Sequence, residues 1–79
     1  MRTEIETQVC FVVGMMVNKD PETLSKDSQF GTDVTVDSLN AMMICAALEE
    51  KYAKAPSFTE LCNMHSIGEI VTFIEENNA

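Results

Sequence analysis

Three segments of the chain open with the same helix-start pattern, a hydroxyl side chain followed three residues later by glutamate. The pairs are Thr3 with Glu6, Ser57 with Glu60, and Ser66 with Glu69. In such a capping box, the hydroxyl and the carboxylate each accept a hydrogen bond from a backbone N–H group near the start of the helix. A fourth start is indicated at Asp37–Ser38, because either short polar side chain can cap a helix that continues at Leu39.

Apolar residues recur at helical spacing after three of these starts. The stripes are Ile5, Val9, Val12 and Met16 with Val13 beside them; Ala41, Ile44, Cys45, Leu48 and Tyr52; and Ile67, Ile70, Val71 and Ile74. The segment from Phe58 to Met64 has room for one or two turns, and the β-branched run Val34–Val36 is too short for a convincing strand. We therefore predict an all-α fold, a small irregular four-helix bundle of three main helices plus one short helix.

A long first loop, residues 18–36, separates the first two predicted helices. Pro21 suits the first position of a short helical turn that follows Asp20. Leu24 and Phe30 are the apolar side chains expected to anchor this loop to the bundle. With 79 residues in all, we predict one domain over residues 1–79.

Charge and composition narrow the class of protein. The formal net charge is −8, from 13 acidic and five basic side chains, which argues against nucleic acid as a partner. The apolar stretch Val9–Val17 is too short to cross a membrane, so we expect a cytoplasmic protein without membrane insertion. No cysteine lies at a metal-ligand spacing from the single histidine, His65, so no metal site is predicted. Cys10, Cys45 and Cys62 are expected to be reduced and buried, and the pair Met15–Met16 to lie in or near the core.

The tripeptide Asp37-Ser38-Leu39 stands after the long loop at the start of a predicted helix, with Phe30 eight residues before the serine. Downstream come Ala47-Leu48-Glu49-Glu50-Lys51-Tyr52, a short helix and a final helix ending in Phe73-Ile74. From Ile5 to Ile74 this chain resembles an acyl carrier protein. The resemblance implies that a phosphopantetheinyl transferase attaches a 4′-phosphopantetheine arm from coenzyme A to Ser38. The thiol of that arm would carry acyl groups as thioesters.

The resemblance also implies roles for other residues. Asp37 would help the transferase recognise the site, and Leu39 would help seat the arm and contact partners. The partners implied are the transferase and acyl-processing enzymes (synthases and transferases), met by a monomer. An acyl chain could fold between the second and third helices, lined by Met42, Cys45, Ala46, Leu61, Cys62 and Ile67. Catalysis by the chain itself is not expected, because a single histidine provides no triad to activate Ser38.

Two departures from the family pattern bear on partners. Val34-Thr35 replaces the usual Leu-Gly, so the turn before the helix must form without glycine. Asn40-Ala41-Met42-Met43 replaces a stretch that usually opens with acids. We therefore predict a docking face in which apolar Met42 and Met43 are flanked by Asp33, Glu49 and Glu50, serving a specialised pathway rather than bulk fatty acid synthesis.

Other readings of the sequence stay open. The same bundle could be a non-catalytic interaction module in which Ser38 is an ordinary, unmodified helix cap. It could also be a peptidyl or aminoacyl carrier of a nonribosomal peptide pathway, although such carriers more often have histidine before the serine. A small enzyme or a DNA-binding domain fits less well, since acid/base pairs, phosphate loops and positive charge are lacking.

Overall fold

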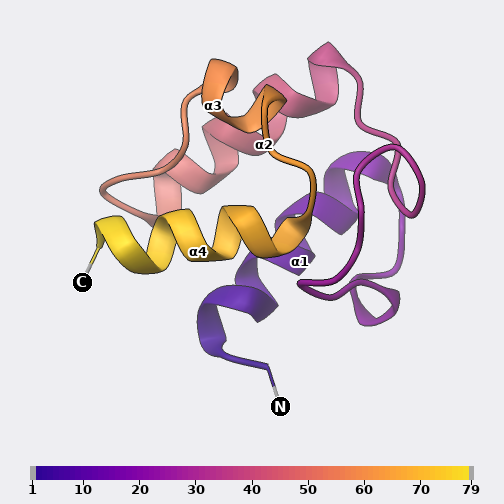
Figure 1. The fold of residues 1–79 in the computed structure, drawn as a ribbon, viewed down its shortest axis with the longest axis horizontal. Coiled ribbons are helices and arrows are strands. Elements are labelled where there is room, and N and C mark those ends of the chain that lie inside the picture. Colours follow the sequence, from indigo (N-terminus) through magenta and orange to yellow (C-terminus); the bar gives the residue numbers. More distant parts are fainter. Residues whose placement is uncertain (1, 79) are drawn as a thin grey trace.

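The computed structural model describes residues 2–78, whose helices surround an aliphatic core (Figure 1). The long helices are α1 (Glu4–Val17), α2 (Ser38–Lys51) and α4 (Ile67–Asn77), and the short α3 (Phe58–Cys62) precedes α4. Helix α1 packs against both α2 and α4, and α2 also packs against α3. The predicted all-α fold with three main helices and one short helix is confirmed. None of the helices in this range is both long and apolar enough to cross a membrane.

The core consists of the predicted apolar stripes. The side chains of Val9, Val13, Ile44, Leu48, Ile67, Ile70 and Ile74 are completely buried. Each buried aliphatic side chain of this size contributes about 1.5–3 kcal/mol of transfer free energy, which makes this shared core the main source of stability. The loop adds Val34, which is also completely buried although its sequence context predicted no such role.

The helix starts follow the predicted patterns to different degrees. At α3 the box is complete, since Ser57 Oγ accepts from Glu60 N at 3.1 Å and Glu60 Oε1 accepts from Ser57 N at 2.9 Å. At α1, Thr3 Oγ1 accepts from Glu6 N at 3.1 Å, but the Glu6 carboxylate turns to the long loop instead. The box predicted at Ser66 is wrong, because Ser66 makes no side-chain cap hydrogen bond there.

The start of α4 is capped by the long loop. Ile67 N donates to Ser28 O at 3.1 Å, and Gly68 N donates to Lys26 O at 2.8 Å. These carbonyl groups satisfy N–H groups of the first helical turn that a Ser66 hydroxyl would otherwise serve. The Glu69 carboxylate was predicted to accept from the backbone N–H of Ser66. Its Oε2 atom accepts instead from the backbone N–H of the preceding residue, His65, at 2.6 Å.

The long loop contains the predicted short helical turn, η1 (Pro21–Thr23), which is capped by the Asp20 side chain. Leu24 is buried and Phe30 is half-buried against the core, so both predicted anchors are confirmed. Two isolated β-bridges, Gln29 with Ser66 and Phe30 with Val34, replace any regular strand in the described part of the chain. Figure 1 shows this segment running in magenta from the end of α1 to the start of α2.

Lys26 joins the loop to two helices through its backbone. Its N–H group donates to Glu6 Oε2 of α1 at 3.1 Å, while its carbonyl oxygen accepts from Gly68 of α4. Glu6 is buried, and a buried carboxylate is tolerated where hydrogen bonds replace its lost hydration. We refer to these two hydrogen bonds as the Lys26 clip.

Two burial predictions are wrong. Met15 is 61% exposed rather than near the core, because it lies on the outer stripe of α1 with Thr7 and Phe11. Cys62 is exposed at the end of the short α3, whereas Cys10 and Cys45 are buried as predicted. All three cysteines are free, since none forms a disulfide.

The Lys26 clip makes Gly68→Ala a sharp test of the fold. A Cβ atom at Gly68 would lie 2.7 Å from Lys26 O, so the loop backbone would have to move. Within an unobstructed helix, alanine in place of glycine adds about 1 kcal/mol of stability. We expect Gly68→Ala to lower the free energy of unfolding instead, by about 1–3 kcal/mol in urea denaturation. The exposed Thr72→Ala change on the same helix is the control, and a more stable Gly68→Ala variant would contradict the clip.

Candidate functional site

The start of α2 is closed by a reciprocal pair of side chains. Asp37 Oδ1 accepts from Asn40 N at 2.8 Å, and Asn40 Oδ1 accepts from Asp37 N at 3.5 Å. Asp37 is therefore the capping residue, which decides between the two candidates that the sequence offered. The cap does not need the hydroxyl of Ser38.

Ser38 occupies the first residue of α2 and is exposed to solvent. No acidic side chain follows it in the first turn, because Leu39, Asn40 and Ala41 are all uncharged. The free N–H groups and the dipole at the start of a 14-residue helix favour an anionic group there. The site can therefore hold a phosphate ester on the Ser38 hydroxyl.

Asn40 also joins this end of α2 to α1. Its Nδ2 atom donates to Met16 O at 2.8 Å, near the C-terminal end of α1. One side chain thus completes the cap and holds the first turn of α2 against its neighbour. No pattern in the sequence predicted this contact.

The segment before the helix forms its turn without glycine, as predicted. Asp37 has extended backbone angles, φ −91° and ψ −179°. Within residues 2–78, a positive φ occurs only at Asn18 and Gly31, not at Thr35. Val34 buries its side chain completely, which fixes the path of the chain into α2.

The predicted apolar part of the docking face is exposed. The exposed fractions are 60% for Leu39, 52% for Met42 and 43% for Met43, all within the first two turns of α2. Exposed apolar side chains gathered at one place mark a site of interaction more often than scattered ones do. Leu39 directly follows Ser38, and Met42 and Met43 lie about one turn further along the same helix.

The acidic residues of the predicted docking face are divided between the two ends of α2. Asp33 lies in the preceding loop, where its carboxylate accepts from Gln29 N at 2.8 Å. Glu49 and Glu50 are exposed near the other end, about 16–18 Å along the helix axis from Ser38 at 1.5 Å per residue. The three acids therefore border the apolar residues rather than mix with them.

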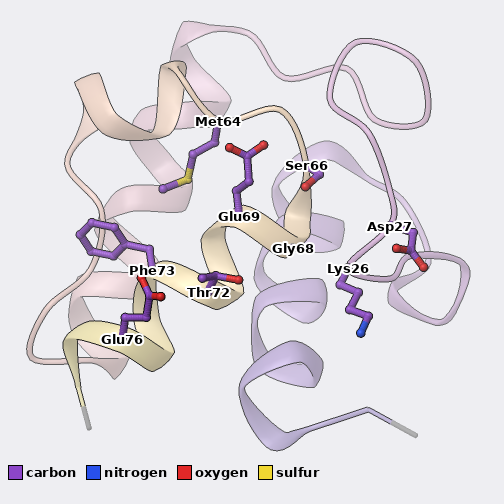
Figure 2. A pocket seen from close by; sticks show the side chains of 9 residues that line it. All are labelled: Lys26, Asp27, Met64, Ser66, Gly68, Glu69, Thr72, Phe73 and Glu76. Carbon is purple, nitrogen blue, oxygen red and sulfur yellow. The ribbon is translucent and has the colours of Figure 1, made fainter.

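The six side chains predicted to line an acyl cleft between α2 and α3 are divided between the core and the surface. Cys45, Leu61 and Ile67 are buried in the core, whereas Met42, Ala46 and Cys62 are exposed. A groove of about 490 Å³ lies elsewhere, along α4. Figure 2 shows Met64 and Phe73 at one side of this groove and Lys26 at the other. None of the six residues predicted to line the acyl cleft borders it.

The single histidine makes its contacts at the start of α4 rather than at Ser38. His65 lies in the connection before α4, its Nδ1 atom 3.6 Å from Glu69 Oε2 and its side chain largely exposed. No group of three or more potential metal ligands comes together within residues 2–78. Burial raises the pKa of the Cys10 and Cys45 thiols, which lowers the thiolate fraction of both at neutral pH.

Comparison with known proteins identifies a family model and several relatives that match this chain. Residues 7–74 match the family model described as "Phosphopantetheine attachment site". A protein named acyl carrier protein from Wolinella succinogenes is 33% identical over 84% of this chain and 87% of its own length. Acyl carrier proteins from Rickettsia canadensis and Chlamydia trachomatis are 26% and 27% identical, over 96% and 92% of this chain and 88% and 95% of their own lengths.

The helical fold and the match over residues 7–74 define a carrier that bears covalently attached 4′-phosphopantetheine. Together with the similarity to its relatives, they show that the chain belongs to the acyl carrier protein family. Members of this family are carriers rather than catalysts, and they interact with phosphopantetheinyl transferases and acyl-processing enzymes.

The residues present fit the arm. Ser38 supplies an exposed hydroxyl that the helix cap leaves unused. The N–H groups of Ser38 and Leu39 are left for a phosphate, because those of Asn40 and Ala41 donate to Asp37. Leu39 and Met42 offer apolar surface beside it. When attached, the arm supplies a thiol for thioester chemistry, while the chain itself positions and exposes the attachment point.

The capping role of Asp37 predicts a loss of stability on Asp37→Ala. Removal of a capping side chain leaves an N–H group of the first turn without its acceptor, and costs about 1 kcal/mol. We expect urea denaturation of the apo protein to show that loss, while Asp37→Asn, which keeps an acceptor oxygen, stays within about 0.5 kcal/mol of the wild type. Equal stability of the alanine and asparagine variants would contradict the cap.

The exposures of the three cysteines predict selective alkylation. Cys62 is accessible, whereas burial hides Cys10 and Cys45 and raises the pKa of each. Iodoacetamide at neutral pH should therefore modify the folded apo protein first at Cys62, giving one adduct by intact mass. The Cys62→Ser variant should lose this fast step, and urea should make all remaining thiols react. Equal labelling of three sites in the folded protein would contradict the structure.

Proposed function

We propose that Ser38 is the residue that carries the 4′-phosphopantetheine arm, and that the chain holds acyl intermediates on it as thioesters. The observation that carries this proposal is the position of Ser38, exposed at the first residue of α2 with its hydroxyl released from capping by Asp37 and Asn40. The carrier domain then comprises residues 1–79. The acyl groups belong to fatty acid, polyketide or related specialised biosynthesis.

The proposal makes Ser38 an acceptor rather than a nucleophile activated by its own protein. Removal of the hydroxyl proton needs a base, and the only histidine is His65, which lies against Glu69. We therefore assign the proton transfer to the transferase. Asp37, directly before Ser38, then serves both as helix cap and as part of the surface that the transferase meets.

We propose a docking face for partner enzymes that runs along the exposed side of α2. Leu39, Met42 and Met43 form its apolar part, and Asp33, Glu49 and Glu50 lie toward its two ends. A partner suited to it has an apolar patch flanked by basic side chains, since opposite charges speed encounter while apolar contact supplies binding energy. This composition supports a specialised pathway rather than bulk fatty acid synthesis.

The alternative is an interaction module of the same fold with an unmodified Ser38. One measurement separates the two functions. The apo protein is incubated with a broad-specificity phosphopantetheinyl transferase, coenzyme A and magnesium, and its intact mass is followed. We expect a gain of roughly 340 Da in the wild type and none in Ser38→Ala.

The matched control is Ser57→Ala, which removes another serine next to a helix start while leaving Ser38 in place. This variant should gain the same mass as the wild type. No gain in folded wild-type protein would favour the unmodified interaction module, and a gain that persists in Ser38→Ala would move the attachment point elsewhere.

A further inference from the structure

The exposed large hydrophobic side chains of residues 2–78 are concentrated on two helices. Five of the six lie on α1 or on the first half of α2, and the sixth, Phe58, begins α3. The two on α1 are Phe11, 47% exposed, and Met15, 61% exposed. Neither belongs to the docking face proposed on α2.

Helices α1 and α2 lie side by side in opposite directions. At one end, Asn40 Nδ2 donates to Met16 O. At the other end, Glu4 and Gln8 of α1 border the same hollow as Lys51 and Tyr52. The Asn40–Met16 hydrogen bond at one end and this shared hollow at the other define an antiparallel pair with one continuous seam.

Helical spacing assigns side chains to this seam. On α1, Phe11 and Met15 continue the row that begins with Glu4 and Gln8, at steps of three or four residues. On α2, Met43 lies about one turn after both Leu39 and Asn40. Asn40 faces α1, whereas Leu39 and Met43 lie on the exposed side of α2 next to it. The four side chains Phe11, Met15, Leu39 and Met43 therefore form one exposed surface across the seam, which we call the α1–α2 face.

Met42 points to a different neighbour. It lies one turn before Cys45, whose pKa is raised mainly by burial and, to a smaller extent, by Glu49 and by the nearby Cys62 thiol of α3. The two adjacent methionines are thus turned about 100° from each other around α2, with Met42 toward α3 and Met43 toward α1. Apolar surface at the start of α2 consequently extends in both directions from Leu39.

Charge is absent from the whole α1–α2 face. Residues 7–17 and 38–48 contain no Asp, Glu, Lys or Arg, in a chain whose net charge is −8. The acids stand at the ends of the two helices: Asp20, Asp33 and Asp37 with Lys19 at the end near Ser38, and Glu4, Glu49 and Glu50 with Lys51 at the other. Each end therefore keeps an excess of negative charge. The face is an uncharged band between two acidic borders.

We propose that the outer side of α1, through Phe11 and Met15, forms part of the surface that docks on enzymes acting at Ser38. This inference rests on the proposed function and extends its docking face across the seam. The occupant is an apolar patch of such an enzyme with basic side chains at both ends, which matches the acidic borders. Continuity with Leu39, the residue after Ser38, brings any protein bound there to the attachment point.

A second copy of the chain fits this face less well. Two copies would bring like-charged acidic borders together, which costs free energy. A stable interface also uses about 20–30 residues from each side, whereas four exposed apolar side chains suit a brief encounter. A carrier must leave each enzyme after its arm has reacted, so short-lived contact agrees with the proposed function.

The test compares the double variant Phe11→Gln, Met15→Gln with the wild type as substrates of a broad-specificity phosphopantetheinyl transferase. We expect the KM for the apo carrier to rise roughly tenfold, because the variant loses the apolar contacts of two side chains, and that rise corresponds to about 1.4 kcal/mol. The kcat should stay close to that of the wild type, because neither side chain touches Ser38. Phe58→Gln, an exposed aromatic residue on α3, is the matched control and should leave the KM unchanged.

Three results would overturn the proposal. The first is a KM for the double variant within twofold of the wild type. The second is an equal rise in Phe58→Gln. The third is a wild type that sediments as a dimer or binds phosphatidylcholine vesicles, with either property lost in the double variant.

The thermal midpoint of each variant checks its fold, and Met15→Gln alone, at the more exposed position, replaces the double variant if that unfolds. A wild type that gains no arm at all would instead contradict the proposed function of Ser38.

Discussion

The Lys26 clip is the contact on which the arrangement of this small bundle depends. The long loop between α1 and α2 has a large conformational entropy to lose, and few apolar side chains to offset it. Its backbone is held at one residue by two helices at once, through Glu6 Oε2 of α1 and the Gly68 N–H group of α4. The same contact satisfies the buried Glu6 carboxylate and the open start of α4, groups that would otherwise destabilise the fold. Because the loop is held there, Val34 can enter the core and direct the chain into α2.

At the start of α2, one residue, Asn40, makes three hydrogen bonds that hold the site in place. Its backbone N–H and side-chain oxygen complete the cap with Asp37, and its side-chain nitrogen reaches Met16 O of α1. The cap therefore closes without the Ser38 hydroxyl, and the first turn is fixed to a neighbouring helix rather than free to fray. A modifying enzyme meets an exposed hydroxyl on a rigid support, while the chain retains the stability of a capped helix.

Local patterns predicted the parts of this structure that local forces decide. The stripes through Val9, Ile44 and Ile70 followed from helical periodicity, and Asp37 and Ser57 followed from capping chemistry. The predictions failed where a distant partner competed. Ser66 does not cap α4, because loop carbonyl groups reach the same N–H groups. Met15 is an apolar residue of the kind usually found in a core, yet neither α2 nor the loop covers its side of α1. The choice between Asp37 and Ser38 as cap also required the fold, since both side chains suit that position.

Apolar surface on a small acidic domain carries an opposing constraint. The core is thin, so side chains such as Leu39 and Met43 would stabilise the fold if they were buried, and exposing them leaves that free energy unused. Uncovered apolar patches also promote association between copies. The net charge of −8 opposes that association, because two copies repel each other before their apolar surfaces meet. A partner with basic side chains around its own apolar patch experiences attraction instead. The acidic borders therefore make binding to the uncharged face selective. They favour partners with basic side chains and disfavour association with another copy of the same acidic chain.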